Sequence, residues 1–280
     1  MDLYNRVAQE LSRTVTLQYS TSFGSASRLY DADIRPHIFN IYAWVRMGDE
    51  IVDTYRGKDA DQLLMDYKKE TYRTLKNGFS TNPIIHSFCL TARAYGIDSA
   101  LIDPFLESMA LDLKPPKIST RSYYKKYIYG SAQVVGLMCL RVFTGNDTKV
   151  YNHLRPGAES LGAAFQKINF LRDFASDVKE LGRSYFPEVK NKTLDETAKQ
   201  KIITDIRHDF THSLPALHQL PKNSRTAVAV AAQYYSELLD TLEHTPAHTI
   251  SKERIRLSNW RKAQIIARVK TSYTLKRTVS

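Results

Sequence analysis

The chain has 280 residues, 42% of them hydrophobic and 25% charged, which are the proportions of an ordinary globular protein and exclude wholesale disorder. Its content of only 11 glycines and 10 prolines disfavours collagen-like, low-complexity and many-turned all-β proteins. Forty lysines and arginines against 29 acidic residues give a net charge of +11, which attracts nucleic acid, anionic lipid or phosphorylated small molecules.

Helical periodicity runs through almost the whole chain, with Gly, Pro and Asn between segments. It predicts helices at 3–19, 35–56, 59–76, 83–95, 99–113, 120–143, 148–180, 196–217, 223–244 and 251–272. No Gly/Ser-rich linker divides the chain, so we expect one all-α domain over 1–280. The longest uncharged stretch, 77–92, is shorter than the roughly 20 residues that span a bilayer, and the N-terminus has no apolar signal region. We therefore expect a cytoplasmic protein.

Hydroxyl side chains gather at 19–23, where the first predicted helix ends, and include Ser20 and Ser22. Such a cluster either caps a helix or donates hydrogen bonds to phosphate oxygens. A second feature is the uncharged run 127–140, which contains the small residues Gly130 and Gly136. Its small residues suit either close packing of another helix or the approach of a ligand chain. The residues leave both pairs of interpretations open.

Charged side chains interrupt an otherwise apolar helix predicted at 37–55. Asp49 and Asp53 lie four residues apart and Arg46 lies three residues before Asp49, so the three share one face. Desolvated carboxylates at this spacing repel each other strongly, and an apolar helix requires a cation to hold them. Taken alone, the pattern also matches an ordinary surface ion pair.

The same pattern recurs about 120 residues later, within 161–178. Polar side chains again follow at spacings of three and four on an apolar helix: Gln166, Asn169, Arg172 or Asp173, and Asp177. Two such acidic faces, if they meet across a helical bundle, form a set of oxygen ligands suited to Mg²⁺ that shares its other positions with phosphate. The arginines add fork-shaped donors for the same phosphates. The repetition favours a metal and phosphate site over two surface ion pairs.

The last thirty residues, 251–280, hold nine basic residues and one acidic residue. This composition predicts a basic C-terminal helix and tail, which is either a solvated helix face or an attachment to an anionic membrane or a diphosphate. We do not expect a nucleic-acid partner, because no recognised DNA- or RNA-binding module accompanies the charge.

Four motifs, in chain order, resemble those of the head-to-head trans-isoprenyl diphosphate synthases, which comprise squalene, dehydrosqualene and bacterial phytoene synthases. They are S-x-S-F at 20–23, R-x-x-D-E-I-V-D at 46–53, Y-x-Y-G-x-A-x-x-V-G-L-M at 127–138, and Q-x-x-N-x-L-R-D-x-x-x-D followed by G-R-x-Y-F-P at 166–187. The chain has G-S-A-Q at 130–133 where many relatives have Y-V-A-G. The resemblance implies an isoprenoid-synthase-type helical bundle with a central apolar cavity.

The resemblance also implies roles for individual residues. Mg²⁺, with Mn²⁺ as its alternative, would be held by Asp49, Asp53, Asp173 and Asp177. The substrate diphosphates would be bound by Ser20, Ser22, Arg46, Gln166, Asn169 and Arg172. Tyr129 would lie at the reacting centre.

The reaction that the resemblance implies is condensation of two geranylgeranyl diphosphates to phytoene through a cyclopropylcarbinyl diphosphate, without NADPH. The alternatives are squalene or dehydrosqualene synthesis from farnesyl diphosphate and, from another class, a non-catalytic relative of respiratory complex I assembly factors. The implied partners are a prenyl diphosphate and, because the product is a lipid, an anionic membrane contacted peripherally through 251–280. The residues do not predict an oligomeric state.

Overall fold

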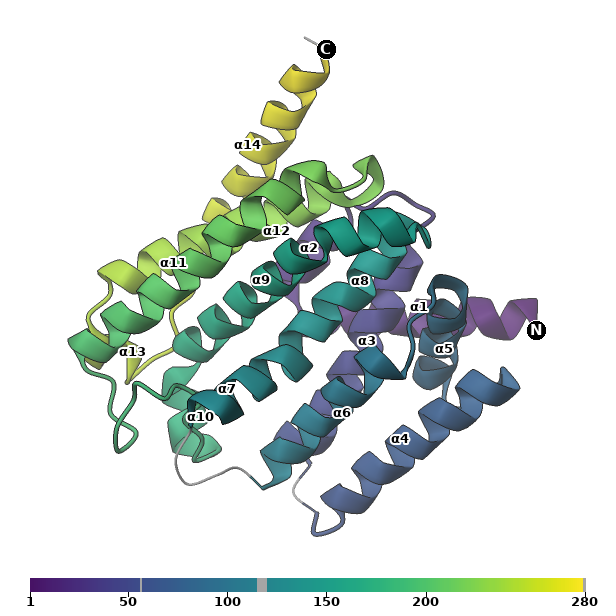
Figure 1. Ribbon diagram of the computed structural model, residues 1–280, viewed down its shortest axis with the longest axis horizontal. Helices are drawn as coiled ribbons and strands as arrows, with labels where there is room; N and C mark the ends of the chain where they lie inside the picture. Colours follow the sequence, from purple (N-terminus) through teal and green to yellow (C-terminus); the bar gives the residue numbers. More distant parts are fainter. Residues whose placement is uncertain (56, 115–119, 279–280) are drawn as a thin grey trace.

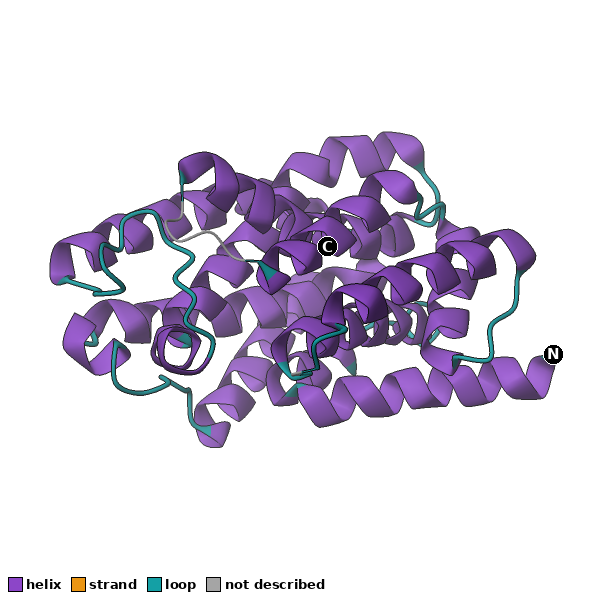
Figure 2. Ribbon diagram, turned by 90° about the horizontal axis from the view of Figure 1, so that it is seen from below, coloured by secondary structure: helices purple, strands orange, loops and turns teal. Residues whose placement is uncertain are grey.

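The computed structural model describes residues 1–280 apart from 56, 115–119 and 279–280, and apart from the side chains of 21–23, 270 and 272–278. Within the described residues the chain forms helices and no strands, with one isolated bridge between Lys190 and Thr193 (Figure 2). The prediction of an all-α fold is confirmed.

The first half of the chain contains α1 (Asp2–Tyr19), α2 (Thr21–Ser27), α3 (Arg35–Asp53), α4 (Ala60–Asn77), α5 (Pro83–Tyr95) and α6 (Ser99–Leu113). The second half contains α7 (Arg121–Ile128), the π-helical turn η1 (Tyr129–Gln133), α8 (Val134–Thr144), α9 (Thr148–Arg172), α10 (Phe174–Glu180), α11 (Glu196–Gln219), α12 (Lys222–His244), α13 (Ala247–Ile250) and α14 (Asn259–Thr278).

These elements differ from the predicted helices at a few places. The short helices α2 and α13 were not expected, and the single helix predicted at 120–143 is α7, η1 and α8 in succession. The helix predicted at 148–180 breaks at Asp173, which ends α9 and begins α10. The last helix begins at Asn259 rather than near 251, so the basic segment before it is not helical.

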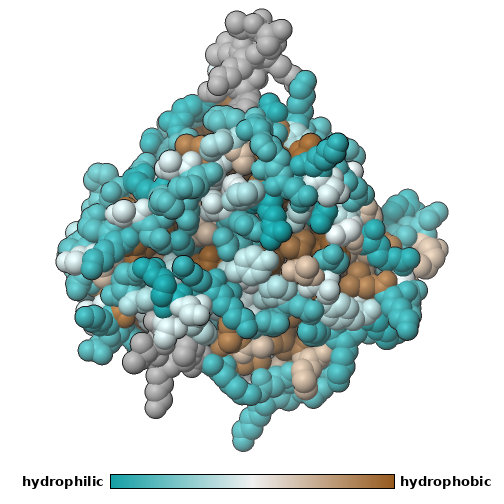
Figure 3. Space-filling view, viewed as in Figure 1, coloured by the Kyte–Doolittle hydropathy of each residue, from teal (hydrophilic) through white to brown (hydrophobic). Residues whose placement is uncertain are grey.

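Neighbouring helices lie side by side across the molecule, from α11 through α9, α8 and α6 to α4, while α1, α3 and α5 lie behind them (Figure 1). Polar side chains cover most of this face and hydrophobic ones show mainly in the gaps between helices (Figure 3). This distribution is typical of amphipathic helices around a shared core. None of the helices within the described residues is long and apolar enough to cross a bilayer.

The turn between α8 and α9 shows how local sequence sets this arrangement. Gly145 ends α8 in the left-handed conformation, with φ of 57°, which glycine adopts without strain. Asp147 then caps α9, because its side chain accepts hydrogen bonds from the backbone N–H groups of Lys149 and Val150. The two signals fold α8 and α9 into an antiparallel pair.

A buried tryptophan, Trp44, fixes the face of α3 that packs against α4 and α5. Trp44 is fully buried, its ring stacks on Phe88 at 4.1 Å between centroids, and its Nε1–H donates to Thr71 Oγ1 at 3.1 Å. Tyr67 Oη donates in turn to the Trp44 carbonyl at 2.8 Å. Asp53 is nine residues, or two and a half turns, beyond Trp44, so it lies on the opposite face of α3. Anchoring Trp44 therefore turns the acidic residues of α3 away from α4 and α5.

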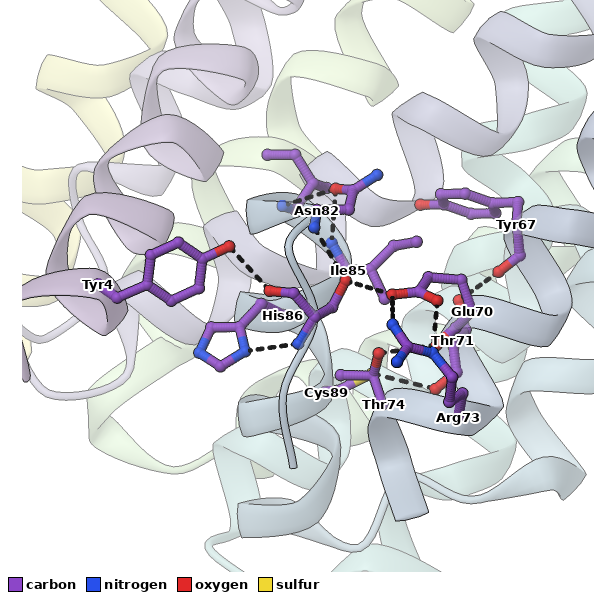
Figure 4. A network of polar contacts seen from close by, with 12 residues as sticks. Tyr4, Tyr67, Glu70, Thr71, Arg73, Thr74, Asn82, Ile85, His86 and Cys89 are labelled. Carbon is purple, nitrogen blue, oxygen red and sulfur yellow. Dashed lines mark hydrogen bonds and ion pairs between the residues drawn. The ribbon is translucent and has the colours of Figure 1, made fainter. Parts of the chain in front are cut away.

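A network of polar contacts holds α4 and α5 together beside α3 (Figure 4). Asn82 caps α5 by accepting from the N–H groups of Ile84 and Ile85, and Glu70 of α4 accepts from Ser80 Oγ at 2.5 Å. Tyr4 of α1 donates to the Ser80 carbonyl at 2.8 Å. These contacts stabilise the scaffold on the side away from the predicted site.

Candidate active site

A cavity of about 1010 Å³ lies between α3, α8, α9, α11, α12 and α14. Its lining follows α9 from Leu154 to Asp173, and this separation corresponds to about 29 Å at a rise of 1.5 Å per residue. Charged and amide side chains line the Asp173 end, whereas apolar side chains line most of the rest. The cavity therefore has a polar end and a long apolar interior.

The polar end contains all four aspartates of the two acidic motifs. Asp49 and Asp53 come from α3, Asp173 joins α9 to α10, and Asp177 lies on α10. The structure thus brings two motifs 120 residues apart to one end of one cavity. This juxtaposition is what the repeated acidic pattern predicted.

The carboxyl groups at this end are buried and lie close enough together to repel one another when ionised. Burial, with added repulsion from Asp53, raises the pKa of Asp49 to about 8. Burial, with added repulsion first from Asp173 and then from Asp53, raises the pKa of Asp177 to about 7. Such a cluster of hard oxygen donors fits a divalent cation.

The protein supplies only part of a coordination shell. Among the described residues, no three His, Cys, Asp or Glu side chains lie close enough to hold a metal ion by themselves. An ion at this end would complete its shell with water and with oxygen atoms of a ligand, which is how Mg²⁺ is commonly bound beside phosphates. The donor set therefore fits a metal that arrives with, or is shared with, an anionic ligand.

The two motif arginines also line the polar end. Arg46 pairs with Glu50, lies 3.8 Å from Asp49 through Nη1 and Oδ2, and covers the Tyr19 ring at 4.6 Å. Arg172 Nε donates to the adjacent Asp173 Oδ1 at 2.9 Å. Both guanidiniums are thus held at the cavity by carboxylates of their own motifs.

A third arginine, Arg254, joins them from the segment before α14. Its Nε lies 2.7 Å from Asp173 Oδ1, and it lines the cavity together with Arg256 and Lys262. Burial and the neighbouring guanidinium of Arg172 lower the pKa of Arg254. The polar end therefore has enough crowded positive charge to bind a polyanion.

Reasoning from the sequence missed this role for Arg254, because it treated the C-terminal thirty residues as one basic helix. The signal was present in the alternation of charged and apolar residues at 254–257, which is typical of an extended segment. Ser258 also accepts from the N–H of Arg261 at 3.2 Å, as a helix-capping serine does.

Arg183 of the G-R-x-Y motif, in the loop after α10, contacts the acidic cluster. Arg183 is 7% exposed and donates through Nη1 to Asp53 Oδ1 at 2.6 Å and through Nη2 to the carbonyls of Val52 and Asp112 at 3.1 and 2.9 Å. Arg183 therefore joins the end of α3 to the end of α6.

Asp112 is a further polar residue at the site. It is 4% exposed and lines the cavity, and it accepts hydrogen bonds from Tyr127 and, at 3.2 Å, from Tyr185. Burial raises the pKa of Asp112 to about 6 although Arg183 lies 3.5 Å away. Asp112 belongs to no motif and follows an apolar run, so the sequence offered no signal for it.

The hydrogen-bonding residues expected at the site are placed as follows. Ser20, Gln166 and Asn169 line the cavity. Ser20 interacts with the Tyr42 side chain, and Asn169 Oδ1 accepts from Tyr235 Oη at 3.2 Å. The side chain of Ser22 lies outside the described residues.

The structure does not place Tyr129 at the cavity. Tyr129 packs against the hydrophobic core, whereas Tyr127 lines the cavity. Side chains two residues apart on a helix point about 200° apart, so only one of these tyrosines can face the interior. Tyr127, and not Tyr129, is therefore the tyrosine of this motif that lines the cavity.

Gly130, the residue after Tyr129, allows this helix to pack closely against α6. A Cβ atom on Gly130 would lie 2.2 Å from the Pro104 carbonyl oxygen of α6, which is closer than atoms can approach. Gly130 belongs to η1, and π-helical turns of this kind are frequent at functional sites. The turn brings the helix that carries Tyr127 directly against α6, which carries Asp112.

The chain matches a known protein family. The sequence profile of the squalene/phytoene synthase family matches residues 16–261. A phytoene synthase of Arthrospira platensis is 26% identical over 93% of both chains, and a 15-cis-phytoene synthase of Pantoea ananas is 26% identical over 78% of this chain and 77% of its own.

Solved structures agree on the fold. A dehydrosqualene synthase crystallised with a ligand superposes with a TM-score of 0.82 at 19% identity, covering 96% of this chain and 98% of its own. A squalene synthase from Alicyclobacillus acidocaldarius superposes with a TM-score of 0.74 at 18% identity, covering 90% and 97%. The chain is therefore a prenyltransferase and belongs to the squalene/phytoene synthase family.

Proposed function

We propose that this protein condenses two geranylgeranyl diphosphates head to head to give phytoene. The observation that carries the proposal is the meeting of two acidic motifs at one end of a long apolar cavity. The acidic motifs suit the diphosphate head of the substrate, and the long apolar cavity suits its prenyl tail. The similarity to phytoene synthases over nearly the whole chain supports this product over squalene or dehydrosqualene.

At the polar end, Asp49, Asp53, Asp173 and Asp177 would hold Mg²⁺, or Mn²⁺ in its place. The metal, when bound, supplies positive charge that stabilises the departing diphosphate. Arg46, Arg172 and Arg254 would donate to the phosphate oxygens as fork-shaped donors, and Ser20, Ser22, Gln166 and Asn169 would add hydrogen bonds. These residues orient the head so that C1 of the prenyl chain enters the apolar interior.

The apolar interior protects the allylic carbocation that forms when diphosphate leaves. Water would quench this cation, and the cavity lining beyond the polar end excludes it. Phe165 of α9 stacks on Tyr235 of α12 at 4.1 Å between centroids, so aromatic faces border the interior next to the polar end. We assign the tyrosine at the reacting centre to Tyr127, whose hydroxyl is oriented by Asp112.

The length of the interior favours C20 over C15 substrates. Its far end is formed by Tyr30 and Phe143, whose rings stack at 5.4 Å between centroids. Phe143 precedes α9, so this end is separated from Asp173 by most of that helix. A substrate that fills the space between the two ends is a long one.

We further propose that the enzyme is cytoplasmic and contacts an anionic membrane through the basic C-terminal region. Trp260 of α14 is 72% exposed and Arg261 beside it is half exposed, a combination suited to a membrane surface. Sedimentation with liposomes of acidic lipid at low salt tests this contact. Retention of the protein in the supernatant would contradict it.

The decisive experiment is incubation with Mg²⁺ and either the C15 or the C20 diphosphate, with and without NADPH, followed by identification of the product. We expect phytoene from the C20 substrate, independent of NADPH. Squalene or dehydrosqualene from the C15 substrate would replace our assignment by the alternative one. No product from either substrate would favour a non-catalytic relative.

A further inference from the structure

A second cavity, of about 530 Å³, lies on the other side of α11 and α12 and reaches α14. Half of its lining side chains are apolar, namely Phe210, Leu214, Leu217, Ala229, Ala232 and Val269, and the polar half consists of Arg207, Thr211, His218, Gln233, Ser236 and Arg268. Leu214 is 48% exposed, so the cavity has an apolar mouth at the surface. None of the residues assigned to diphosphate or metal binding lines it.

The second cavity adjoins the reaction cavity through the contact between α11 and α12. Leu217 lines both cavities. On α12, Val228 and Ala231 line the reaction cavity while their neighbours Ala229 and Ala232 line the second one. Between these two helices, small side chains and Leu217 thus form the wall that separates the two spaces.

The neighbouring contact, between α9 and α11, offers no such route. A Cβ atom on Gly157 of α9 would lie 2.2 Å from the Cβ of Ala216 of α11. The backbones of these helices are therefore pressed together. The contact between α11 and α12 is less extensive than the contact between α9 and α11.

Helix α14 lies across this wall and is held by one buried carboxylate. Ile265 and Ile266 of α14 line the reaction cavity, whereas Arg268 and Val269 line the second cavity. The helix packs chiefly against α12 and extends beyond the rest of the molecule (Figure 1).

Glu237 of α12 fixes α14 in this position. Its side chain is 8% exposed, it lies 2.6 Å from Arg261 Nε through Oε2, and it also pairs with Arg268. The two arginines are themselves more than half exposed. Water reaches the arginines, so these two ion pairs can open at the surface, whereas displacement of α14 would also expose the buried side chains of Ile265 and Val269.

The proposed reaction creates a need for an exit of this kind. Its product is a hydrocarbon without a charged head, so it has no favourable route past the aspartates and arginines of the polar end. We propose that the second cavity is the exit site for this apolar product, and that α14, held by Glu237, closes the passage. This inference rests on the proposed function.

The first test fills the second cavity without touching the reaction cavity. Ala232→Phe places a ring in the second cavity, and Ala267→Phe, on the exposed face of α14, is the matched control. After a single turnover of C20 diphosphate, the transfer of labelled product to phosphatidylcholine vesicles is timed. We expect several-fold slower transfer for Ala232→Phe, with single-turnover chemistry and melting temperature unchanged, and no change for Ala267→Phe. Parental transfer rates in a folded Ala232→Phe would overturn the exit site.

The second test addresses the closing helix. Glu237→Gln removes the charge that both arginines contact, so we expect faster hydrogen exchange at 259–269 and several-fold faster product transfer. Faster exchange with unchanged transfer would overturn the role of α14 as a closure. Unchanged hydrogen exchange would show that Glu237 does not hold α14. This result would also overturn the role of α14 as a closure.

A third test is independent of catalysis. Crystals soaked in 1-bromohexadecane should show bromine in the second cavity of the parent protein and none there in Ala232→Phe. Absence of bromine from the parent cavity would overturn the site even in an active enzyme. Failure of the proposed function is seen separately, as the absence of any product in the single-turnover experiment.

Discussion

Arg183 donates a 2.6 Å hydrogen bond to Asp53, a residue 130 positions earlier in the chain. The same guanidinium bonds to the backbone at the ends of α3 and α6. The loop after the second acidic motif is thereby fastened to the first one. The distance between the two motifs is set by this loop as well as by the packing of α8 against both α3 and α9.

Replacing Arg183 should therefore damage both stability and metal binding. Arg183→Gln leaves Asp112 buried without its cation, and breaking a buried pair in this way costs about 3–5 kcal/mol of unfolding free energy. Urea denaturation measures the loss, and the Mg²⁺ dependence of activity measures the displacement of Asp53. Arg183→Lys should recover part of the stability, and a Gln variant as stable as the parent would contradict this role.

Neutralising an acidic residue at the cavity should separate activity from stability. Above about pH 8, where Asp49 is ionised, Asp49→Asn removes a buried charge that its neighbours repel, so the metal-free protein should melt at a higher temperature than the parent. The same change should lower turnover by more than about 100-fold, because metal-derived stabilisation amounts to several kcal/mol. Calorimetry in EDTA and product formation in Mg²⁺ check the two effects. Retained turnover would remove Asp49 from the metal site.

The raised pKa values of Asp49 and Asp177 predict how metal-free stability depends on pH. In the unfolded chain these carboxyls ionise near pH 4, whereas in the folded protein the pKa values are about 8 and 7. Between these limits the folded protein binds more protons than the unfolded chain, so stability must fall as pH rises from about 4 to 8.

Addition of Mg²⁺ should reverse this loss, because a bound cation favours the ionised carboxylates. Melting temperatures measured from pH 5 to 8 in EDTA and in Mg²⁺ should diverge progressively with pH. Parallel curves would show that the acidic cluster does not bind the ion. In Asp49→Asn the EDTA curve should be flatter than in the parent.

The aromatic pair at the far end of the reaction cavity should limit substrate length. Phe143→Ala removes a ring from the wall opposite the aspartates, and longer prenyl diphosphates, such as the C25 compound, should then be accepted. Competition between C20 and C25 substrates gives the ratio of kcat/KM values. Phe79→Ala, at an exposed ring outside the cavity, is the control and should not change this ratio. An unchanged ratio in a folded Phe143→Ala protein would place the limit elsewhere.

Arg254 should contribute to substrate binding although it lies far from both motifs in sequence. A charged hydrogen bond to phosphate is worth about 1.5–3 kcal/mol, so Arg254→Gln should lower kcat/KM by about 10- to 100-fold. Lys252→Gln changes a neighbouring exposed cation that does not line the cavity and should have little effect. Equal losses in both variants would indicate a general effect of charge.

The sequence predicted that the two acidic pairs line one cavity because its signal is local. Asp49 and Asp53, like Asp173 and Asp177, are four residues apart, and helical geometry alone places each pair on one face. Repetition of the pattern indicated that the two faces meet. The fold class followed from helical periodicity in the same way.

What the sequence could not predict depends on contacts between distant segments. Asp112 becomes a site residue only because α6 packs against η1, and no feature of its own segment announces this contact. The choice between Tyr127 and Tyr129 depends on how the helix is rotated, which is set by its packing. Predicting Arg254 as a site residue depends on knowing that the basic C-terminal region begins as an extended segment rather than as a helix.

The contact at Gly130 restricts how this enzyme can change. Many relatives carry a tyrosine at the position that begins Y-V-A-G, yet here any side chain would collide with the Pro104 carbonyl. A single substitution cannot introduce that tyrosine, since α6 would first have to move and would carry Asp112 with it. Engineering that grafts a tyrosine onto this position must therefore redesign both helices together.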